Sequence, residues 1–422
     1  MKRYLLLILL ALIGLSLNAQ SWQWAENINS GNAQAVPNSI TTDIHGRVYV
    51  TGQYIADTII FGNDSLINIT SHNAYIVKYD NEGNVIWARG SQGNCKGYGS
   101  AIISDDSGYV YVTGYFNSAI DTAVIFGNDT LSNPYQNNAN DIYVIKYDSL
   151  GNIKWTKRAG GTGNDQSTGI AVDKTGNVYV SGFMNGSSYN NDSLTFGSSS
   201  IHFNGHGNMF LLKYSSAGIP VWAMTQGGVG LTEAHSVASD SIGNVYVTGT
   251  YINSAIIFGP DTLTAPGTNN YIFLTKFNSS GNVIWSKGMG STSNNGPDNA
   301  LSVVTDRNGN VFISGSLKGT TTFGTYTLTV TGGSTFMFIA KYDSSGTALW
   351  AKSGGLGTYN TGYGMITDPS NNVYVTGTYH NGISFDSTTS FPTGFGLFVV
   401  KYNSTGTVIW AKNATEIGRA HV

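Results

Sequence analysis

Residues 170–182 read IAVDKTGNVYVSG and residues 209–224 read MFLLKYSSAGIPVWAM, and these two stretches decide the fold. Each stretch holds two runs of β-branched, aliphatic and aromatic residues separated by a short polar segment that contains a glycine. Such a segment is typical of a tight turn, because Asp and Ser bond nearby backbone groups and Gly adopts a left-handed conformation without strain. Each stretch therefore predicts a β-hairpin, and the pair predicts a unit of four strands.

The same unit recurs along the chain. A tryptophan in the fourth strand marks each copy, at steps of 60 to 68 residues: Trp24, Trp87, Trp155, Trp222, Trp285, Trp350 and Trp410. An aspartate opens the first turn of each complete copy: Asp43, Asp105, Asp173, Asp240, Asp306 and Asp368. A fixed period indicates that each unit buries its apolar face only against its neighbours. We therefore predict that the tryptophans of this series are buried between units.

The first strand of each unit carries a small residue four positions before the turn aspartate: Ser39, Ala101, Gly169, Ser236, Ser302 and Gly364. A column of small residues suits an innermost strand, where several sheets converge on one axis. Radially arranged four-stranded sheets form a β-propeller, so we predict an all-β propeller of antiparallel blades over residues 20–415. Six complete blades and one orphan N-terminal strand are visible, and we expect seven blades in the full protein. An insert between the second and third strands explains the long period and is predicted to form an outer hairpin.

These motifs resemble a known family. The D-x-x-G-N-V-Y-V-T-G core, the K-Y-D at Lys78 to Asp80 and the G-N-V-I-W-A at Gly83 to Ala88 resemble SBBP-type β-propeller repeat proteins of secreted, Bacteroidetes-like bacterial origin. The resemblance covers the chain from about Trp24 to Lys412. It implies a propeller, an extracytoplasmic location and membership in a longer multidomain surface protein, and it implies no reaction.

The two ends of the chain differ from the repeat. Residues 1–19 have the order of a signal peptide: Lys2 and Arg3, an apolar run too short to span a bilayer, and small residues before Gln20. We therefore expect a secreted or cell-surface protein without a membrane span, whose mature form begins at Gln20. Residues 416–422 match nothing in the repeat and are assigned no function. We expect the chain to be an incomplete copy, with the missing strands following Lys412.

Composition argues against several classes of site. Charged residues make up 11% of the chain, against about 25% in typical domains, and no basic track suits nucleic acid. His202 and His206 have a metal-like spacing only in a helix, and the hairpin context argues against one. Each turn offers one carboxylate, whereas Ca²⁺ takes about six to eight oxygens, so we expect no metal and no cofactor. Cys95 is the only cysteine, which leaves a passive position or a reactive thiol.

The connections that precede each first strand vary while the framework repeats, which makes them the candidate ligand rim. Its polar members are Asn164, Asp165, Glu233, His235 and Asp298, and its aromatic members, suited to stacking on sugar rings, are Tyr98, Tyr359 and Tyr363. Neutral variation of loop sequence is the competing interpretation.

No catalytic triad or carboxylate pair stands out from the repeat, so we predict that the protein is not an enzyme. The leading hypothesis is a secreted or cell-surface binding or scaffold module for a glycan or protein ligand. The alternative is a propeller enzyme that acts on extracellular polysaccharide. Two or more carboxylates that converge on the axis would favour the enzyme, and a channel lined by Ser, Ala and Gly would favour the binding module.

Overall fold

The structure is a computed structural model that describes residue 24 and residues 34–415, except 56, 69–71, 118–122, 136–137, 186–191, 204–206, 228–229, 253–254, 266–268, 292–297 and 332. The expected signal peptide, the 416–422 tail and His206 lie outside the described residues. The described part consists of strands and connecting turns, and it holds no helix that could span a membrane.

Six four-stranded antiparallel units follow one another in the chain, as the repeat predicts. The first three blades are β1 (Gln34–Thr42), β2 (Val48–Ile55), β5 (Asn73–Tyr79) and β6 (Val85–Gly90); β8 (Lys96–Ser104), β9 (Val110–Asn117), β12 (Asn140–Tyr147) and β13 (Ile153–Gly161); and β14 (Asn164–Val172), β15 (Val178–Asn185), β18 (Asn208–Tyr214) and β19 (Pro220–Gln226). The other three are β20 (Thr232–Ser239), β21 (Val245–Tyr251), β24 (Tyr271–Phe277) and β25 (Val283–Met289); β26 (Asn299–Thr305), β27 (Val311–Leu317), β30 (Phe336–Tyr342) and β31 (Ala348–Ser353); and β32 (Thr361–Thr367), β33 (Val373–His380), β36 (Phe395–Tyr402) and β37 (Val408–Thr415).

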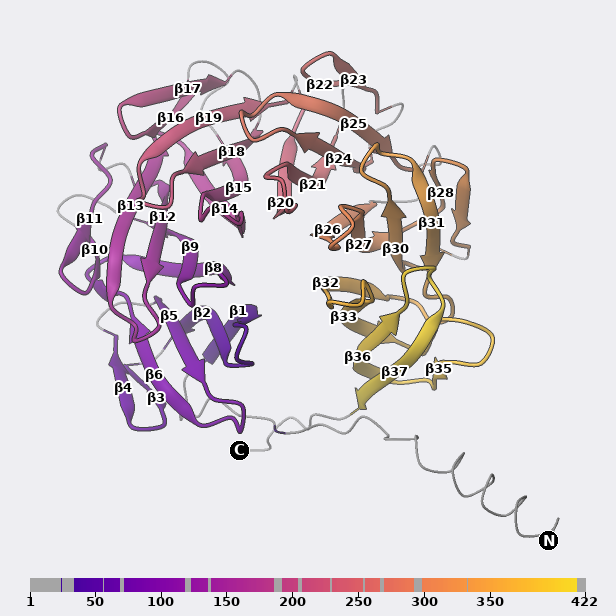
Figure 1. The fold of residues 1–422 in the computed structure, drawn as a ribbon, viewed down its shortest axis with the longest axis horizontal. Helices are drawn as coiled ribbons and strands as arrows, with labels where there is room; N and C mark the ends of the chain where they lie inside the picture. The colour runs from indigo at the N-terminus through magenta and orange to yellow at the C-terminus, as the bar shows by residue number, and fades with distance from the viewer. Residues whose placement is uncertain are drawn as a thin grey trace, which may run out of the picture.

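Figure 1 shows these sheets around a common centre, with the first strands innermost and the tryptophan-bearing fourth strands outermost. The all-β propeller architecture predicted from the repeat is thus confirmed. The first and sixth blades lie apart in this view, so the ring is open between them.

The predicted insert hairpins are present in all six blades. They are β3 (Thr58–Phe61) with β4 (Asp64–Ile67), β10 (Val124–Phe126) with β11 (Asp129–Leu131), β16 (Asp192–Phe196) with β17 (Ser199–Phe203), β22 (Ile256–Phe258) with β23 (Asp261–Leu263), β28 (Thr320–Phe323) with β29 (Tyr326–Thr329), and β34 (Ile383–Ser384) with β35 (Ser390–Phe391). Several of them pair with the preceding blade. β16 pairs with β13, β10 pairs with β7 (Gln92–Gly93), and single bridges join Gly227 to Ile257 and Gly355 to Ser384.

The first turn of each blade is built by its aspartate, as the third blade illustrates. Asp173 Oδ1 accepts hydrogen bonds from the backbone N–H groups of Thr175 (2.9 Å) and Asn177 (3.0 Å), while Oδ2 accepts from the Tyr179 hydroxyl (3.0 Å). Burial acts to raise the pKa of Asp173, but these hydrogen bonds outweigh it and lower the pKa. Gly176 closes the turn at a φ of +79°. Turn formation therefore accounts for the recurring aspartates.

A bulge in every first strand explains the recurring glycine of the second strand. The register shifts between Ser167 and Gly169 in the third blade, opposite Gly182, and a side-chain carbon at Gly182 would collide with the carbonyl oxygen of Gln166. The same arrangement holds at Gly52, Gly114, Gly249, Gly315 and Gly377.

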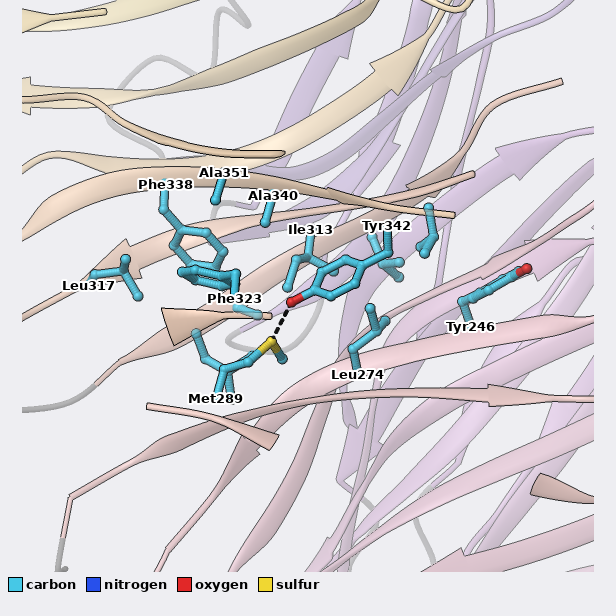
Figure 2. Packing of buried hydrophobic residues seen from close by; sticks show 14 of the residues in the cluster. Tyr246, Leu274, Met289, Ile313, Leu317, Phe323, Phe338, Ala340, Tyr342 and Ala351 are labelled. Atoms are coloured by element: carbon cyan, nitrogen blue, oxygen red, sulfur yellow. Dashed lines mark hydrogen bonds between the residues drawn. The ribbon is translucent and has the colours of Figure 1, made fainter. Parts of the chain in front are cut away.

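The apolar cores lie between blades, which is why single units recur without a core of their own. Figure 2 shows the core between the fourth and fifth blades, where Tyr246 and Leu274 of the fourth blade and Ile313 and Tyr342 of the fifth belong to one apolar cluster. The Tyr342 hydroxyl of the fifth blade donates to Met289 Sδ of the fourth at 2.8 Å.

Candidate functional site

The six first strands line a central channel with a volume of about 720 Å³. Its lining is mainly Ser, Thr, Ala and Gly together with aliphatic residues, and among the described lining residues His235 carries the one imidazole and none carries a carboxylate. Because every blade repeats the same strand order, the connections that precede the first strands gather at one end of this channel, which we call the connection rim (residues 91–98, 162–165, 230–235, 290–298 where described, and 354–363).

Two predicted rim carboxylates are not presented to solvent, and this corrects the expectation from sequence. Asp298 is fully buried and accepts hydrogen bonds from the N–H groups of Ser291 and Lys318 and from the Thr321 hydroxyl, all at 2.8 Å. Asp165 is also buried, and its Oδ2 accepts from Gly161 N at 2.8 Å. Both carboxylates therefore serve as acceptors for backbone N–H groups, those of Gly161 for Asp165 and of Ser291 and Lys318 for Asp298. Burial raises the pKa of Asp298.

His235 links two blades. Its Nδ1 lies 2.8 Å from the carbonyl oxygen of Ala300 in the next blade, so the tautomer that carries the Nδ1 proton donates this hydrogen bond. Its Nε2 lies 3.6 Å from a carboxylate oxygen of Glu233, and both side chains are partly exposed. At the equivalent position of other blades, Asn38 donates to Gly99 O at 2.8 Å and Thr168 donates to Ala234 O at 2.7 Å. This lining position therefore joins neighbouring blades besides facing the channel.

The other rim candidates divide into packed and exposed residues. Tyr98 is partly buried and stacks on Tyr115, with ring centroids 4.7 Å apart. Asn164 is exposed, but its Oδ1 accepts from the backbone N–H of Asn140 at 3.1 Å. Tyr359 and Tyr363 are 66% and 55% exposed, and Tyr363 lines the channel. These two tyrosines are thus the predicted aromatic residues with ring surface open to a ligand.

The second blade holds a buried ion pair that was not predicted from the sequence. Asp141 has no exposed surface, and its Oδ2 lies 2.7 Å from Nε of Arg158. Burial raises the pKa of Asp141 to about 7, although the positive charge of Arg158 acts in the opposite direction. The equivalent positions hold Asn73 and Asn208, so an aspartate where neighbouring repeats carry asparagine was the available signal.

A second missed feature joins the outer strands of neighbouring blades. In the fourth blade, Trp285 Nε1 and Lys276 Nζ both donate to the carbonyl oxygen of Ser344, in the second turn of the fifth blade, at 3.1 and 2.8 Å. We call this the Lys–Trp pair. The same pair acts on the next blade through Lys78 with Trp87, Lys146 with Trp155, Lys213 with Trp222, and Lys341 with Trp350. The recurring K-Y segment at a fixed distance from each tryptophan was the sequence signal.

The burial of the series tryptophans is confirmed for part of the set. Trp87, Trp285 and Trp350 are 5%, 8% and 7% exposed. The partly exposed members are Trp24, Trp155, Trp222 and Trp410. Except at Trp410, the indole N–H group of each series tryptophan donates to a carbonyl oxygen in the second turn of a neighbouring blade.

Cys95 and His202 carry no sign of a reactive or metal site. Cys95 is buried, and burial raises the pKa of its thiol to about 12, which favours the passive interpretation. His202 lies exposed in β17. No cluster of three or more metal-ligating side chains occurs within the part of the chain that the structure describes.

Comparison with protein families decides what kind of repeat this is. The model of the SBBP β-propeller repeat matches residues 23–53 and 154–190. These two segments carry SBBP-type β-propeller repeats. The second match spans β13 to β15, including the aspartate turn of the third blade, so the SBBP signature coincides with the repeat that the structure shows.

Two relatives of this chain are longer than it is. It is 26% identical over 481 residues to an uncharacterized WD repeat-containing protein of Acanthamoeba polyphaga mimivirus, covering 92% of this chain and 34% of that protein. It is 28% identical over 145 residues to the regulatory protein FlaEY of Caulobacter vibrioides, covering 34% of this chain and 13% of that protein. The chain therefore spans about a third of the first relative and about an eighth of the second.

Solved structures similar to this chain differ widely in description. A protein of unknown function from Bacteroides caccae is 10% identical, with a TM-score of 0.29, covering 64% of this chain and 90% of that one. A gluconolactonase from Xanthomonas campestris is 12% identical (TM-score 0.34; 84% and 96% covered), and the NanB sialidase of Streptococcus pneumoniae is 9% identical (TM-score 0.37; 93% and 63% covered).

Proposed function

We propose that this β-propeller is a secreted or cell-surface binding module without catalytic activity, and that the connection rim binds a glycan. The observation that carries the proposal is the pair of exposed tyrosines of the connection rim, Tyr359 and Tyr363, of which Tyr363 lines a channel whose described lining holds no Asp, Glu, Lys or Arg. Neutral sugars are recognised by hydroxyl and amide hydrogen bonds and by stacking on aromatic rings, whereas charged ligands need opposite charges at the site.

The surroundings of the two tyrosines support this proposal. The ring of Tyr359 lies 6.4 Å from that of His380, whose Nδ1 is 3.0 Å from the Thr358 hydroxyl. An aromatic face next to imidazole and hydroxyl groups offers both stacking and hydrogen bonding to one sugar unit. The alternative ligand is a protein, which would use the same exposed rings as an apolar patch.

A glycan array probed with the protein that begins at Gln20 tests the ligand class. We expect binding to a subset of neutral glycans that is lost in a Tyr359→Ala, Tyr363→Ala double variant. Tyr326→Ala is the matched control, because Tyr326 is 38% exposed but lies on the outer hairpin strand β29. An equal loss in the control, or no binding by the parent protein, would refute the glycan proposal. Release of reducing ends from a bound polysaccharide would favour the alternative of a glycan-active enzyme.

The proposed location has its own test. We expect mass spectrometry of protein recovered from the medium or cell envelope to give an N-terminus at Gln20. Folded, cell-associated protein that retains Met1 would contradict both export and cleavage.

A further inference from the structure

The sixth blade carries an interface that has no partner. Lys401 and Trp410 occupy the positions of the Lys–Trp pair, yet Lys401 Nζ turns to Asp368 of its own blade at 3.1 Å. The Trp410 ring contacts Tyr374, also of its own blade, and among the described residues Trp410 Nε1 has no acceptor. In each of the five preceding blades, the lysine at this position donates to a turn carbonyl of the next blade.

Apolar surface is exposed on the same face. Leu397 is 43% and Ile366 is 55% exposed, whereas their equivalents in the fourth blade, Ile272 and Ala238, are 0% and 8% exposed. Thr376 of β33 is exposed, although the equivalent Thr248 is fully buried. The residues of this face match those that other blades bury against a neighbour, so a neighbour of the same kind would bury them.

Within the described part of the chain, the inner strand of the first blade likewise lacks a neighbouring blade on one side, near the axis. Hydroxyl groups at the ends of the first strands donate to the preceding blade: Ser104 to Thr42 O, Ser239 to Val172 O, Thr305 to Ser239 O, and Thr367 to Thr305 O, at 2.8 to 2.9 Å. Thr42 begins this series with an exposed hydroxyl, and among the described residues it has no acceptor. On the first blade, Ile40 is 66% exposed, whereas the equivalent Ile102 is 5% exposed.

Trp24 identifies what belongs between these two faces. Its Nε1 donates to Asn81 O, in the second turn of the first blade, at 3.0 Å. Its ring lies against Gly83, as the ring of Trp285 lies against Gly346. In the five complete interfaces, a tryptophan in this position comes from the fourth strand of the preceding blade. Trp24 therefore marks the place of a blade that precedes the first one around the ring.

We propose that a seventh unit of the same repeat, following β37 in the polypeptide, docks between the sixth and first blades, with Trp24 in the position of its fourth-strand tryptophan. Its second turn presents a carbonyl to Lys401 and Trp410 and a glycine to the indole ring. Its first strand ends in a hydroxyl that donates to Thr367 O, and it offers a carbonyl to the Thr42 hydroxyl. The occupant is thus defined by the Lys–Trp contacts, which all five complete interfaces share, and by the first-strand hydroxyl bond, which four of them share.

Adding the unit tests the proposal. In the extended variant, a copy of residues 354–406 follows Asn413 in the protein that begins at Gln20; this copy contains β32, β33 and β36 with the acceptor Ser404. We expect a monomer with a higher urea midpoint than the parent. We also expect Trp410→Ala, which shifts the midpoint little in the parent, to lower it in the extended variant as much as Trp285→Ala does.

A control extension carries Gly406→Val in the appended copy alone. In the sixth blade Gly406 has a φ of +81°, and a side-chain carbon there would lie 2.9 Å from the indole of Trp350 in the preceding blade; we expect the same clash with Trp410 in the extended variant, so that the gain in midpoint is lost. An extension that stays sensitive to protease, with Trp410→Ala still without effect, would overturn the proposal. So would a parent protein that is a dimer and becomes a monomer on Leu397→Asp, because a second copy would then cover the face.

Discussion

Truncating one tryptophan of the Lys–Trp pair should weaken the propeller only where a neighbouring blade covers it. Trp285 is 8% exposed, and replacing a buried aromatic side chain by alanine costs about 3–5 kcal/mol. Its hydrogen bond to Ser344 O adds about 0.5–1.5 kcal/mol, with no unpaired acceptor left behind, because Lys276 still donates to that oxygen at 2.8 Å. At an m-value of about 3 kcal/mol/M, a loss of about 4 kcal/mol lowers the urea midpoint by roughly 1.3 M.

Trp410→Ala is the matched comparison, because Trp410 has the same place in its blade and its ring contacts only Tyr374 among the described aromatic residues. We expect a midpoint shift less than half as large. Far-UV circular dichroism during urea titration measures both variants, and the first transition is the one compared, because repeat proteins can unfold in more than one step. Equal shifts for the two variants would refute the view that inter-blade burial sets the contribution of these tryptophans.

Three further predictions concern other parts of the frame. Gly218→Ala should destabilise the protein more than Gly333→Ala does. Both glycines have φ above +70°, where a side chain costs about 1–2 kcal/mol, but only at Gly218 would the added methyl lie 2.8 Å from Trp155, whereas nothing lies within 4 Å at Gly333. Thermal melts of the two variants compare their stabilities. Lys341→Met should lower the free energy of unfolding by about 3 kcal/mol, because it leaves the buried Asp306 carboxylate, which lies 3.3 Å from Lys341 Nζ, without its cation. Lys276→Met should lower it less, because the corresponding carboxylate of Asp240 also accepts a hydrogen bond from the Tyr246 hydroxyl. Burial acts to raise the pKa of Asp43, Asp173 and Asp368, but hydrogen bonds outweigh it and lower each pKa below the unfolded value. The stabilisation by these carboxylates is therefore present above about pH 4 and is lost as pH falls through the folded pKa. Urea midpoints at pH 7, 5 and 3 check this, and a midpoint unchanged at pH 3 would contradict it.

The sequence was sufficient for the parts of the fold that depend on local geometry. Asp173 and Gly176 predict their turn because both act within four residues, and the small residue at Gly169 predicts an inner strand because its neighbours on the axis are close. Contacts between units were harder to foresee. Lys276 meets Ser344 across 68 residues, and nothing in the loop sequence shows whether a carboxylate such as Asp298 faces solvent or bonds backbone N–H groups. The seven-blade count stays a prediction.

The insert hairpins have a mechanical consequence. They join neighbouring blades at β13 with β16, β7 with β10, and the bridge from Gly355 to Ser384, while the Lys–Trp pair joins the same blades at their turns. A blade held at both ends of its interface is restrained against rotation on its neighbour. Along these interfaces the connection rim then forms a preorganised frame, so that binding of the glycan proposed above would cost little ordering of the receptor. Selection can vary side chains such as Tyr359 on this frame while the positions from which they project stay the same.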